Sequence, residues 1–549
     1  MGPGVVLIQV LGGVFAWGLA VAAEDVWVFF SDKPDGAGGR LEWLKEDDEW
    51  TSEELDLPLD PNYIAQVKAM GISLRVCSRW FNALTVQASR AQQQQLLELS
   101  FVRQVRPVQR FKRLPVSPGT EDGVAAAKIL AQEEDPSFEQ RAQIGVVHLH
   151  ARGYRGRGVR IAVLDDGFHY LDHKTFAHLR DNGLIIAERD FINGDDVVFD
   201  QANQPHTGDE RGGSQNVHGA QVLSLLAANH PGRLVGVAPE AEYILAKTED
   251  LASEMPIEED RWVAGLEWAD SLGADIVNSS LGYTTWDDGS GYTFSDLDGA
   301  TALTSVAAAL AVRKGIIVVE AAGNQANNSE WPYIIAPADA PGVIAVGAVD
   351  RRQEIAFFSS RGPTADGRIK PDVVAPGVRV VVADIRGGDY MRSSGTSFAA
   401  PLVSGVCALL LQVNPNWGPE EMLESLKKSA KDLGIAGADT VYGWGLVQAF
   451  DASQLDVEGP ALSLSGDPFP HPATLDVVHF PLQLDAEYEV ALRIFDLAGG
   501  LVDEKKKQFF EGANQRFSWE IPERLVNGLY FYQLTASTSK RSGKIAIMR

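Results

Sequence analysis

Cysteine is nearly absent, since Cys77 and Cys407 are the only two among 549 residues. They fall in segments that we assign below to different domains, so a structural disulfide is not expected. Cys407 lies in an apolar stretch beside Val406 and Leu409, where a small buried thiol is the simplest interpretation. Metal ligation by these two cysteines can be set aside as well.

Positive charge is also scarce, because 48 Lys and Arg stand against 74 Asp and Glu, a formal net charge of −26. Such a protein repels phosphate backbones and anionic headgroups, so we expect no nucleic-acid partner. The hydrophobic share of 45% and the charged share of 22% are ordinary for a soluble globular protein. The length predicts roughly three or four folding units.

One long apolar run lies near the N-terminus, from Val5 to Val21. It ends in the small residues Ala20 to Ala23, a pattern that signal peptidase accepts. We therefore expect residues 1–23 to be a cleaved signal peptide and the protein to be secreted or held at the cell surface. A transmembrane anchor is the alternative, although the run is short and interrupted by glycines. The segment has no Lys or Arg, which leaves the exact start of the chain open.

Residues 24–113 predict a small α+β domain with the element order β, α, β, β, α, β. The strands are expected at Val26 to Phe30, Ser73 to Cys77, Ala83 to Ala88 and Val102 to Val108, and the helices at Tyr63 to Met70 and Gln92 to Leu99. This split order is typical of ferredoxin-like domains. Residues 114–140 are rich in Pro, Gly and acidic residues, so they predict a linker that proteases can reach.

Residues 141–455 change to apolar strands that alternate with helices. The strands are short and hydrophobic nearly throughout, as expected of strands buried on both faces. They are Val159 to Leu164, Glu242 to Ala246, Ile276 to Leu281, Ile316 to Ala321 and Val343 to Val349. The alternation predicts a doubly wound, mainly parallel α/β sheet. Residues 456–549 are strand-like and divided by turn residues, which predicts a C-terminal β-sandwich.

Three segments of the α/β region carry candidate catalytic residues. A strand runs directly into Asp165 and Asp166, His218 opens an apolar helix, and Ser397 opens another within Gly-Thr-Ser-Phe-Ala-Ala-Pro. Taken alone, an Asp at a strand end is more often part of a turn or cap, and a lone His is usually structural. The serine segment is harder to explain without chemistry.

The three residue types fit one mechanism. A serine hydroxyl attacks only when an imidazole accepts its proton, and the imidazole needs a carboxylate on its other nitrogen. Ser397 at a helix N-terminus also gains from unpaired backbone N–H groups. Asn324 ends a buried strand, where its amide could donate to an oxyanion, although an Asn in a turn is the alternative.

The order Asp165, His218, Ser397 and the residues around them resemble the subtilisin-like serine proteases, the subtilases of peptidase family S8. Ala321 to Asn324 is similar to the oxyanion strand of that family. The remaining similar segments are Asn278 to Gly282, Phe358 to Pro363 and Lys370 to Gly377. The resemblance covers roughly Ile144 to Leu455.

This resemblance implies a role for each site residue. Ser397 would attack the scissile carbonyl, His218 would act as general base and then acid, and Asp165 would orient it. Asn324 and the Ser397 amide would form the oxyanion hole. An exposed strand edge would pair with extended peptide, opposite a facing wall. The edge is Ser280, Leu281 and Gly282, and the wall is Ala321, Ala322 and Gly323.

The chain departs from the family in two places. The family usually has Ser or Thr where Asp166 stands, so the choice of Asp165 rests on its register with Gly167. The loop from Asn229 to Arg233 lies where secreted subtilisins often bind calcium, but it offers Pro and Arg in place of oxygen ligands. No cofactor is expected to be required, and the metal residues are left open. Calcium at Asp195, Asp196 and Asp200 is an alternative, although a solvated acidic loop explains them better.

The flanking domains resemble partners of this enzyme class. Residues 24–113 look like the subtilase prodomain, which implies a zymogen inhibited by its own N-terminal domain. Residues 456–549 are similar to type IX secretion sorting modules, which implies contact with secretion machinery, and a generic β accessory domain is the alternative. The expected function is that of a secreted serine endopeptidase acting on proteins through an acyl-enzyme. A catalytically inactive subtilase fold used for surface binding or adhesion is the rival hypothesis.

Overall fold

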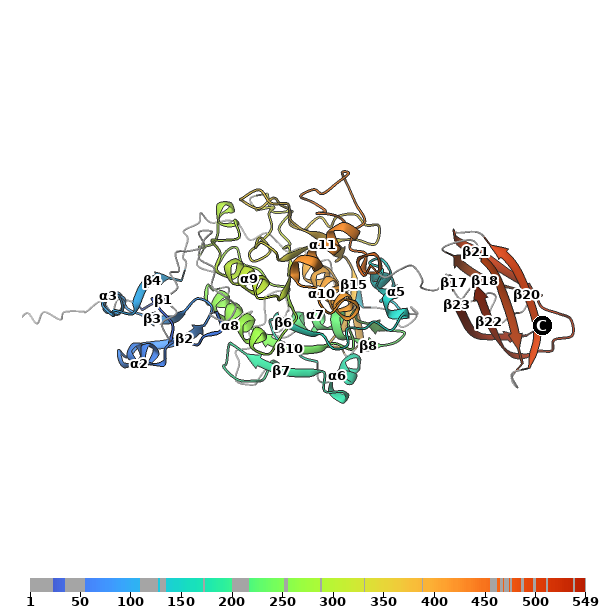
Figure 1. The fold of residues 1–549 in the computed structure, drawn as a ribbon, viewed down its shortest axis with the longest axis horizontal. Helices are drawn as coiled ribbons and strands as arrows, with labels where there is room; N and C mark the ends of the chain where they lie inside the picture. The colour runs from blue at the N-terminus through green and yellow to red at the C-terminus, as the bar shows by residue number, and fades with distance from the viewer. Residues whose placement is uncertain are drawn as a thin grey trace, which may run out of the picture. The chain divides into compact units, whose positions relative to one another are not determined.

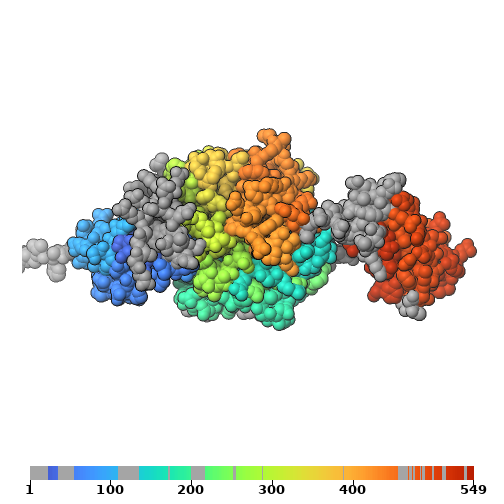
Figure 2. All heavy atoms as spheres, viewed as in Figure 1, coloured from blue at the N-terminus to red at the C-terminus, as the bar shows by residue number. Residues whose placement is uncertain are grey.

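In the computed structural model the chain forms two compact units, Met1–Ser453 and Gln454–Arg549. The described residues are 23–34, 55–108, 127–128, 135–170, 173–199, 217–250, 255–286, 289–329, 331–387, 389–454, 462–464, 468, 473, 476–484, 488–496, 500–509, 512–536 and 539–548. Figures 1 and 2 colour them along the chain. The expected signal peptide lies outside them except for Ala23, as does most of the expected linker.

The N-terminal domain is a four-stranded antiparallel sheet with two helices. The strand order is β2-β3-β1-β4. The elements are β1 (Glu24–Phe30), α2 (Pro61–Ala69), β2 (Ser73–Ser78), β3 (Ala83–Ala88), α3 (Arg90–Leu97) and β4 (Val102–Pro107). Local sequence sets the helix starts, because Asp60 caps α2 with Pro61 behind it and Ser89 forms a capping box with Gln92. The structure confirms the split, ferredoxin-like order of strands and helices that the sequence predicts.

The two faces of β1 serve different cores because side chains alternate along a strand. Val26, Val28 and Phe30 pack under the helices of this domain. Trp27 and Phe29 point the other way and join the large core of the following domain. The N-terminal domain is therefore packed against its neighbour through aromatic side chains.

A seven-stranded parallel sheet forms the centre of the next domain, in the order β14-β13-β12-β11-β6-β10-β7. The strands are β6 (Arg160–Asp165), β7 (Ile185–Asp190), β10 (Glu242–Lys247), β11 (Ile276–Ser279), β12 (Ile317–Ala321), β13 (Ile344–Val349) and β14 (Val373–Pro376). The chain first adds β7 and β10 on one side of β6 and then adds β11 to β14 on the other side. This confirms the predicted doubly wound fold and places its topological switch point at β6.

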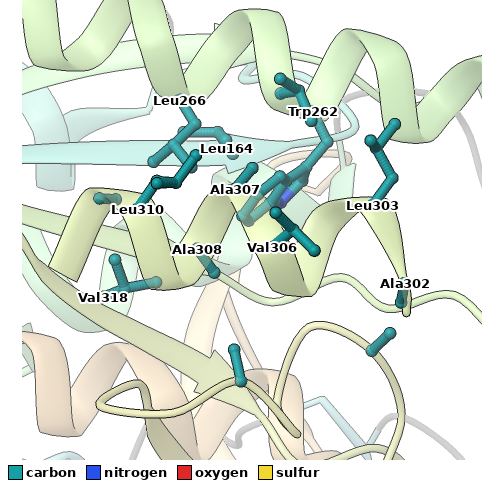
Figure 3. Packing of buried hydrophobic residues seen from close by; sticks show 14 of the residues in the cluster. Leu164, Trp262, Leu266, Ala302, Leu303, Val306, Ala307, Ala308, Leu310 and Val318 are labelled. Carbon is teal, nitrogen blue, oxygen red and sulfur yellow. The ribbon is translucent and has the colours of Figure 1, made fainter. Parts of the chain in front are cut away.

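Helices cover both faces of the sheet. Two, α7 (Val217–Ala227) and α10 (Thr396–Val413), pack against each other and against strands on one face. On the other face lie α8 (Ile257–Ser271) and α9 (Leu303–Arg313), whose apolar side chains interlock over Val318 (Figure 3). Length and composition alone would let α10 cross a membrane, but 83% of it is buried in this core.

The C-terminal unit is a β-sandwich, as the sequence predicts. One sheet has the order β17-β18-β21 and the other β20-β19-β22-β23. The strands are β17 (Leu462–Leu464), β18 (Val477–Leu484), β19 (Tyr488–Phe495), β20 (Leu501–Phe509), β21 (Gly512–Glu520), β22 (Gly528–Ala536) and β23 (Ser539–Ile547). Phe480 and Trp519 from the first sheet and Leu534 and Ile545 from the second are buried in a shared core.

The packing of α10 makes a stability prediction. A Cβ added to Gly405 would lie 2.5 Å from the Cβ of Val237, closer than two carbons can approach. Gly405→Ala should therefore cost about 1–3 kcal/mol by overpacking, more than the roughly 1 kcal/mol that Ala gains over Gly in a helix. We expect a lower apparent unfolding temperature at a fixed scan rate. The exposed substitution Lys428→Ala is the control, and equal unfolding temperatures for the two variants would contradict the prediction.

Candidate active site

The candidate catalytic residues gather at the carboxyl end of the parallel sheet. Asp165 is the last residue of β6, and it pairs with Lys247 at the end of β10. Because the strand order reverses at β6, the loops on its two sides diverge there and leave room for a site. Topology thus places Asp165 where open α/β sheets bind their ligands.

His218 meets Asp165 from the first turn of α7. The His218 Nδ1 and Asp165 Oδ1 atoms are 2.7 Å apart. Asp165 is fully buried, whereas the His218 side chain keeps 33% of its surface exposed. Asp165 Oδ1 also accepts the backbone N–H of Asp166 at 2.8 Å. A buried carboxylate held in this way can fix the tautomer of a partly exposed imidazole.

Ser397 lies in the first turn of α10 and is buried. Its Oγ donates to the carbonyl oxygen of Ser280 at 3.2 Å, and Ser280 Oγ donates back to the carbonyl oxygen of Ser397 at 2.9 Å. The ring of the next residue, Phe398, lies 5.7 Å from the His218 ring. The start of α10 is therefore tied to the end of β11 and faces α7.

Asn324 follows β12 and is held by Thr396, the residue before Ser397. Its Oδ1 accepts from Thr396 N at 2.9 Å and from Thr396 Oγ1 at 3.0 Å. Thr396 Oγ1 in turn accepts from Gly323 N at 3.2 Å. With Oδ1 engaged, the amide NH₂ is turned toward Gly395 at the start of α10. The hydroxyl of Thr396 sets this orientation, a role that the sequence pattern around Ser397 does not indicate.

The two expected substrate-binding segments extend neighbouring strands. The ladder between β11 and β12 ends at the pair Ser279 and Glu320. Ser280, Leu281 and Gly282 follow the first of these strands, and Ala321, Ala322 and Gly323 follow the second. A Cβ on Gly282 would lie 2.1 Å from Ile335 Cδ1, so a larger residue there would have to displace that side chain, and Gly323 has a φ of +104°, which residues with a side chain rarely adopt.

Glu249 is a second residue near the site that no sequence pattern indicates. It follows β10 at the same sheet edge, is buried, and accepts the hydroxyl of Tyr283, the residue after Gly282. Burial raises the pKa of Glu249 to about 7. A titrating carboxyl therefore lies beside the expected substrate strand. A single buried Glu after a strand carries no motif that would have revealed it.

Among the described residues, one group of three potential metal ligands stands out. It is Asp165, Asp166 and His218, whose ligand atoms lie within 4.8 Å of one another. These are the candidate triad residues and their neighbour, so the triad already accounts for the cluster.

The acidic residues considered for calcium have protein partners where they are described. Asp195 Oδ1 accepts from Val197 N, and Asp196 pairs with Arg189 at 3.3 Å. Asp200 lies outside the described residues. In the loop after α7, residues 229–230 pair with 234–235 as a short hairpin. Calcium binding at either place stays a prediction.

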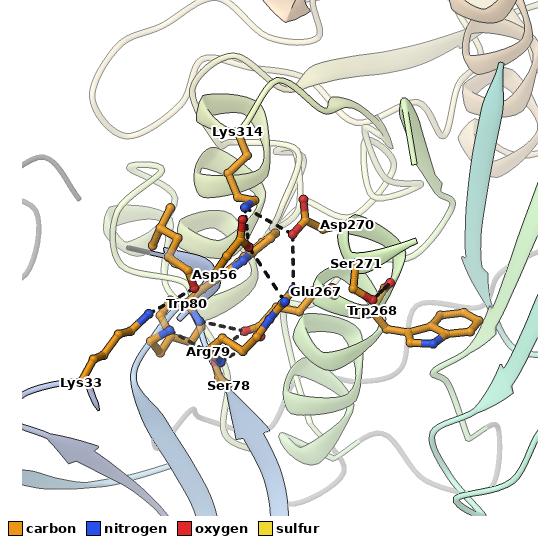
Figure 4. A network of polar contacts seen from close by, with 12 residues as sticks. Lys33, Asp56, Ser78, Arg79, Trp80, Glu267, Trp268, Asp270, Ser271 and Lys314 are labelled. Atoms are coloured by element: carbon orange, nitrogen blue, oxygen red, sulfur yellow. Dashed lines mark hydrogen bonds and ion pairs between the residues drawn. The ribbon is translucent and has the colours of Figure 1, made fainter. Parts of the chain in front are cut away.

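The N-terminal domain is anchored to α8 by a polar network (Figure 4). Glu267 of α8 accepts hydrogen bonds from Ser78 Oγ, from Arg79 N at 2.9 Å and from Trp80 N at 3.4 Å. The ion pairs around it include Arg79 with Glu267 at 3.6 Å, Arg79 with Asp270 at 3.3 Å, Lys314 with Asp270 at 3.3 Å and Lys314 with Asp56 at 2.7 Å. Charge and apolar packing thus act together at this contact.

Comparison with known proteins assigns the two N-terminal parts of the chain. The subtilase family profile of peptidase family S8 matches residues 156–445. The chain belongs to the subtilase family. A second profile, the peptidase S8 propeptide domain of Bacteroidota, matches residues 44–121. This subtilase is therefore a serine-type endopeptidase with a propeptide, and its N-terminal domain is called the prodomain below.

Three similar relatives are subtilisins. Subtilisin of Bacillus pumilus is 32% identical over 315 residues, which are 57% of this chain and 97% of the relative. Subtilisin E of Bacillus subtilis is 32% identical over 57% of this chain and 70% of the relative. Subtilisin Savinase of Lederbergia lenta is 33% identical over 56% of this chain and 94% of the relative. No comparison bears on the likeness of residues 456–549 to sorting modules, which stays a prediction.

The contacts of Thr396 make a kinetic prediction for this subtilase. Thr396→Val removes the hydroxyl that holds both Asn324 and Gly323 but keeps the backbone donor. One hydrogen bond of this kind is worth about 1 kcal/mol, so we expect kcat to fall roughly five- to tenfold with little change in KM. Thr396→Ser keeps the hydroxyl and should behave like the parent on a peptide amide substrate. An unchanged kcat in the valine variant would show that the hydroxyl does not orient Asn324.

Proposed function

We propose that this subtilase is a secreted endopeptidase that cleaves proteins through an acyl-enzyme on Ser397. The observation that carries the proposal is the 2.7 Å contact between His218 and buried Asp165, opposite a serine at a helix N-terminus. The chain is made as a zymogen, with residues 24–113 as its own inhibitor. No cofactor is part of the proposed reaction.

The proposed reaction begins at the serine hydroxyl. Ser397 Oγ turns from the Ser280 carbonyl toward His218 Nε2 and attacks the scissile carbonyl carbon as His218 takes its proton. Asp165 accepts the Nδ1–H of His218, which leaves Nε2 free as a base and stabilises the imidazolium once it forms. His218 then gives the proton to the leaving amine, and water repeats the sequence to release the acid.

The developing oxyanion needs donors placed before the reaction starts. Asn324 Nδ2 and the backbone N–H of Ser397 are the proposed pair, and the positive end of α10 adds to their field. Since Thr396 holds the Asn324 amide oxygen, the NH₂ group does not have to reorient. Losing one such donor lowers turnover by about 10²- to 10³-fold, a magnitude measured in subtilisin itself.

The substrate is an extended stretch of protein chain. Ser280, Leu281 and Gly282 supply backbone groups beyond the end of β11 that can pair with it in the manner of an added strand. Ala321, Ala322 and Gly323 form the opposite side. Folded segments cannot take this shape, so loops and unfolded regions are the proposed targets.

Export and final location complete the proposal. Residues 1–23 would direct export and be removed, and residues 456–549 would engage a secretion machinery. The β-sandwich has its own buried core, as expected of a module that folds separately from the protease. Release into the medium and retention at the surface are both compatible with this arrangement.

A serine-directed fluorophosphonate tests the proposal. The matured enzyme should be labelled at Ser397, whereas Ser397→Ala should take up no label and should accumulate as the uncut precursor. Ser404→Ala, a buried serine later in α10, is the matched control and should still be labelled. A matured parent protein without an adduct at Ser397 would refute the protease mechanism, and normal maturation of Ser397→Ala in pure form would refute self-processing.

The prodomain contact makes a pH prediction through Asp260 of α8. Asp260 is fully buried beside Thr85, with Arg75, Asp25 and Glu259 nearby, and burial raises its pKa well above the usual range. The bound state therefore holds a proton that free α8 releases. Prodomain affinity should be highest below the free pKa of about 4 and fall as pH rises above it.

After cleavage, the fraction of prodomain that co-elutes with the mature enzyme measures this effect between about pH 5 and pH 8. We expect the fraction to fall with pH in the parent and to stay more nearly constant in Asp260→Asn. Glu424→Gln, on the exposed surface of the helix Pro419–Ser429, should follow the parent. Equal pH dependence in the parent and Asp260→Asn would rule out this carboxyl.

A further inference from the structure

Asp166 occupies a place that the proposed mechanism does not use. Its side chain is 1% exposed, and its Oδ1 accepts the backbone N–H of Gly219 at 2.8 Å. Gly219 directly follows His218, and Asp166 directly follows Asp165. This hydrogen bond thus joins the residues that directly follow His218 and Asp165, whose side chains must meet in the triad.

The first turn of α7 is packed tightly onto the turn after β6. A Cβ on Gly219 would lie 2.3 Å from the carbonyl oxygen of Gly167 and 2.9 Å from Asp165 Cβ, so only glycine fits. The first N–H groups of a helix have no partner within the helix and need an outside acceptor. Asp166 supplies that acceptor from 53 residues earlier in the chain.

We infer that Asp166 is a positioning residue, whose side chain docks the first turn of α7 and so sets the distance between His218 and Asp165. The inference rests on the proposed triad function. The carboxyl acts through the helix backbone and need not touch substrate. It adds a backbone hydrogen bond to the side-chain contact between His218 and Asp165.

The protonation state of the Asp166 carboxyl depends on the groups around it. The groups that face it are Asp165 on β6, His218 on α7 and Glu249 beyond β10. Burial and then the Asp165 charge raise the pKa of Asp166 to about 8. At neutral pH it is therefore a neutral acid that still accepts from Gly219. Above that pH it ionises and places a second negative charge near the imidazolium, which favours the transition state.

Two substitutions separate docking from charge. Asp166→Asn keeps an oxygen acceptor for Gly219 but cannot ionise, and Asp166→Ala removes the acceptor. Each variant is expressed as the full chain, and active sites are counted by phosphonate titration of Ser397. Kinetics on a peptide amide are then measured from about pH 6 to pH 10.

We expect Asp166→Ala to lower kcat roughly ten- to a hundredfold, as small misplacements of catalytic groups do, with KM within about twofold. Asp166→Asn should stay within about threefold at pH 7. The parent should show a second rise in kcat/KM near pH 8 that Asp166→Asn lacks. Glu249→Gln should keep this rise, which assigns it to Asp166.

A parental kcat and pH profile per titrated site in Asp166→Ala would overturn the inference. So would an Asn variant as impaired as the Ala variant, because the oxygen acceptor would then not matter. If Asp166→Ala does not mature, the low-field proton resonance of His218 Nδ1–H can be recorded in uncut Ser397→Ala chains. This resonance should persist when Asp166→Asn is added and should shift or vanish when Asp166→Ala is added. An unchanged resonance in the chain with Asp166→Ala would refute docking. Failure of the triad proposal itself is distinct, because the parent would then take up no phosphonate.

Discussion

The contact between a helix N-terminus and a strand end holds the candidate active site together. Asp165 ends β6 and His218 begins α7, and their side chains meet only because the backbone of α7 approaches the turn after β6 closely. Ser397 and Asn324 are attached to the same place through α10 and Thr396. Four residues from distant parts of the chain therefore depend on how two helices dock on one edge of a parallel sheet.

Sequence reasoning predicted much of the architecture for a simple physical reason. Strands buried on both faces are short and apolar throughout, and longer helical stretches separate them, so the alternation is visible in the residues themselves. The prodomain order and the β-sandwich follow from short alternating strands and their turns. The candidate site residues were visible because Asp165, His218, Ser397 and Asn324 lie in short segments of unusual composition.

Other features depend on contacts that no local pattern encodes. Thr396 looks like any helix-start residue until its hydroxyl is seen between Asn324 and Gly323. Glu249 and Asp260 are single acidic residues whose burial comes from distant elements. The bond from Gly219 to Asp166 spans two separate segments. Such residues acquire their properties from tertiary packing, which a propensity or a spacing cannot report.

Because side chains alternate along β1, the two faces of this prodomain strand are buried in different cores. Half of that strand is completed by its own helices, and the other half, with Trp27 and Phe29, is completed by the enzyme. A detached prodomain would bare this aromatic face to water and lose part of its stabilising core. Its chain would then open into the extended form that a protease digests. If the prodomain inhibits the enzyme as proposed, a digested prodomain could not rebind, and its removal would be irreversible.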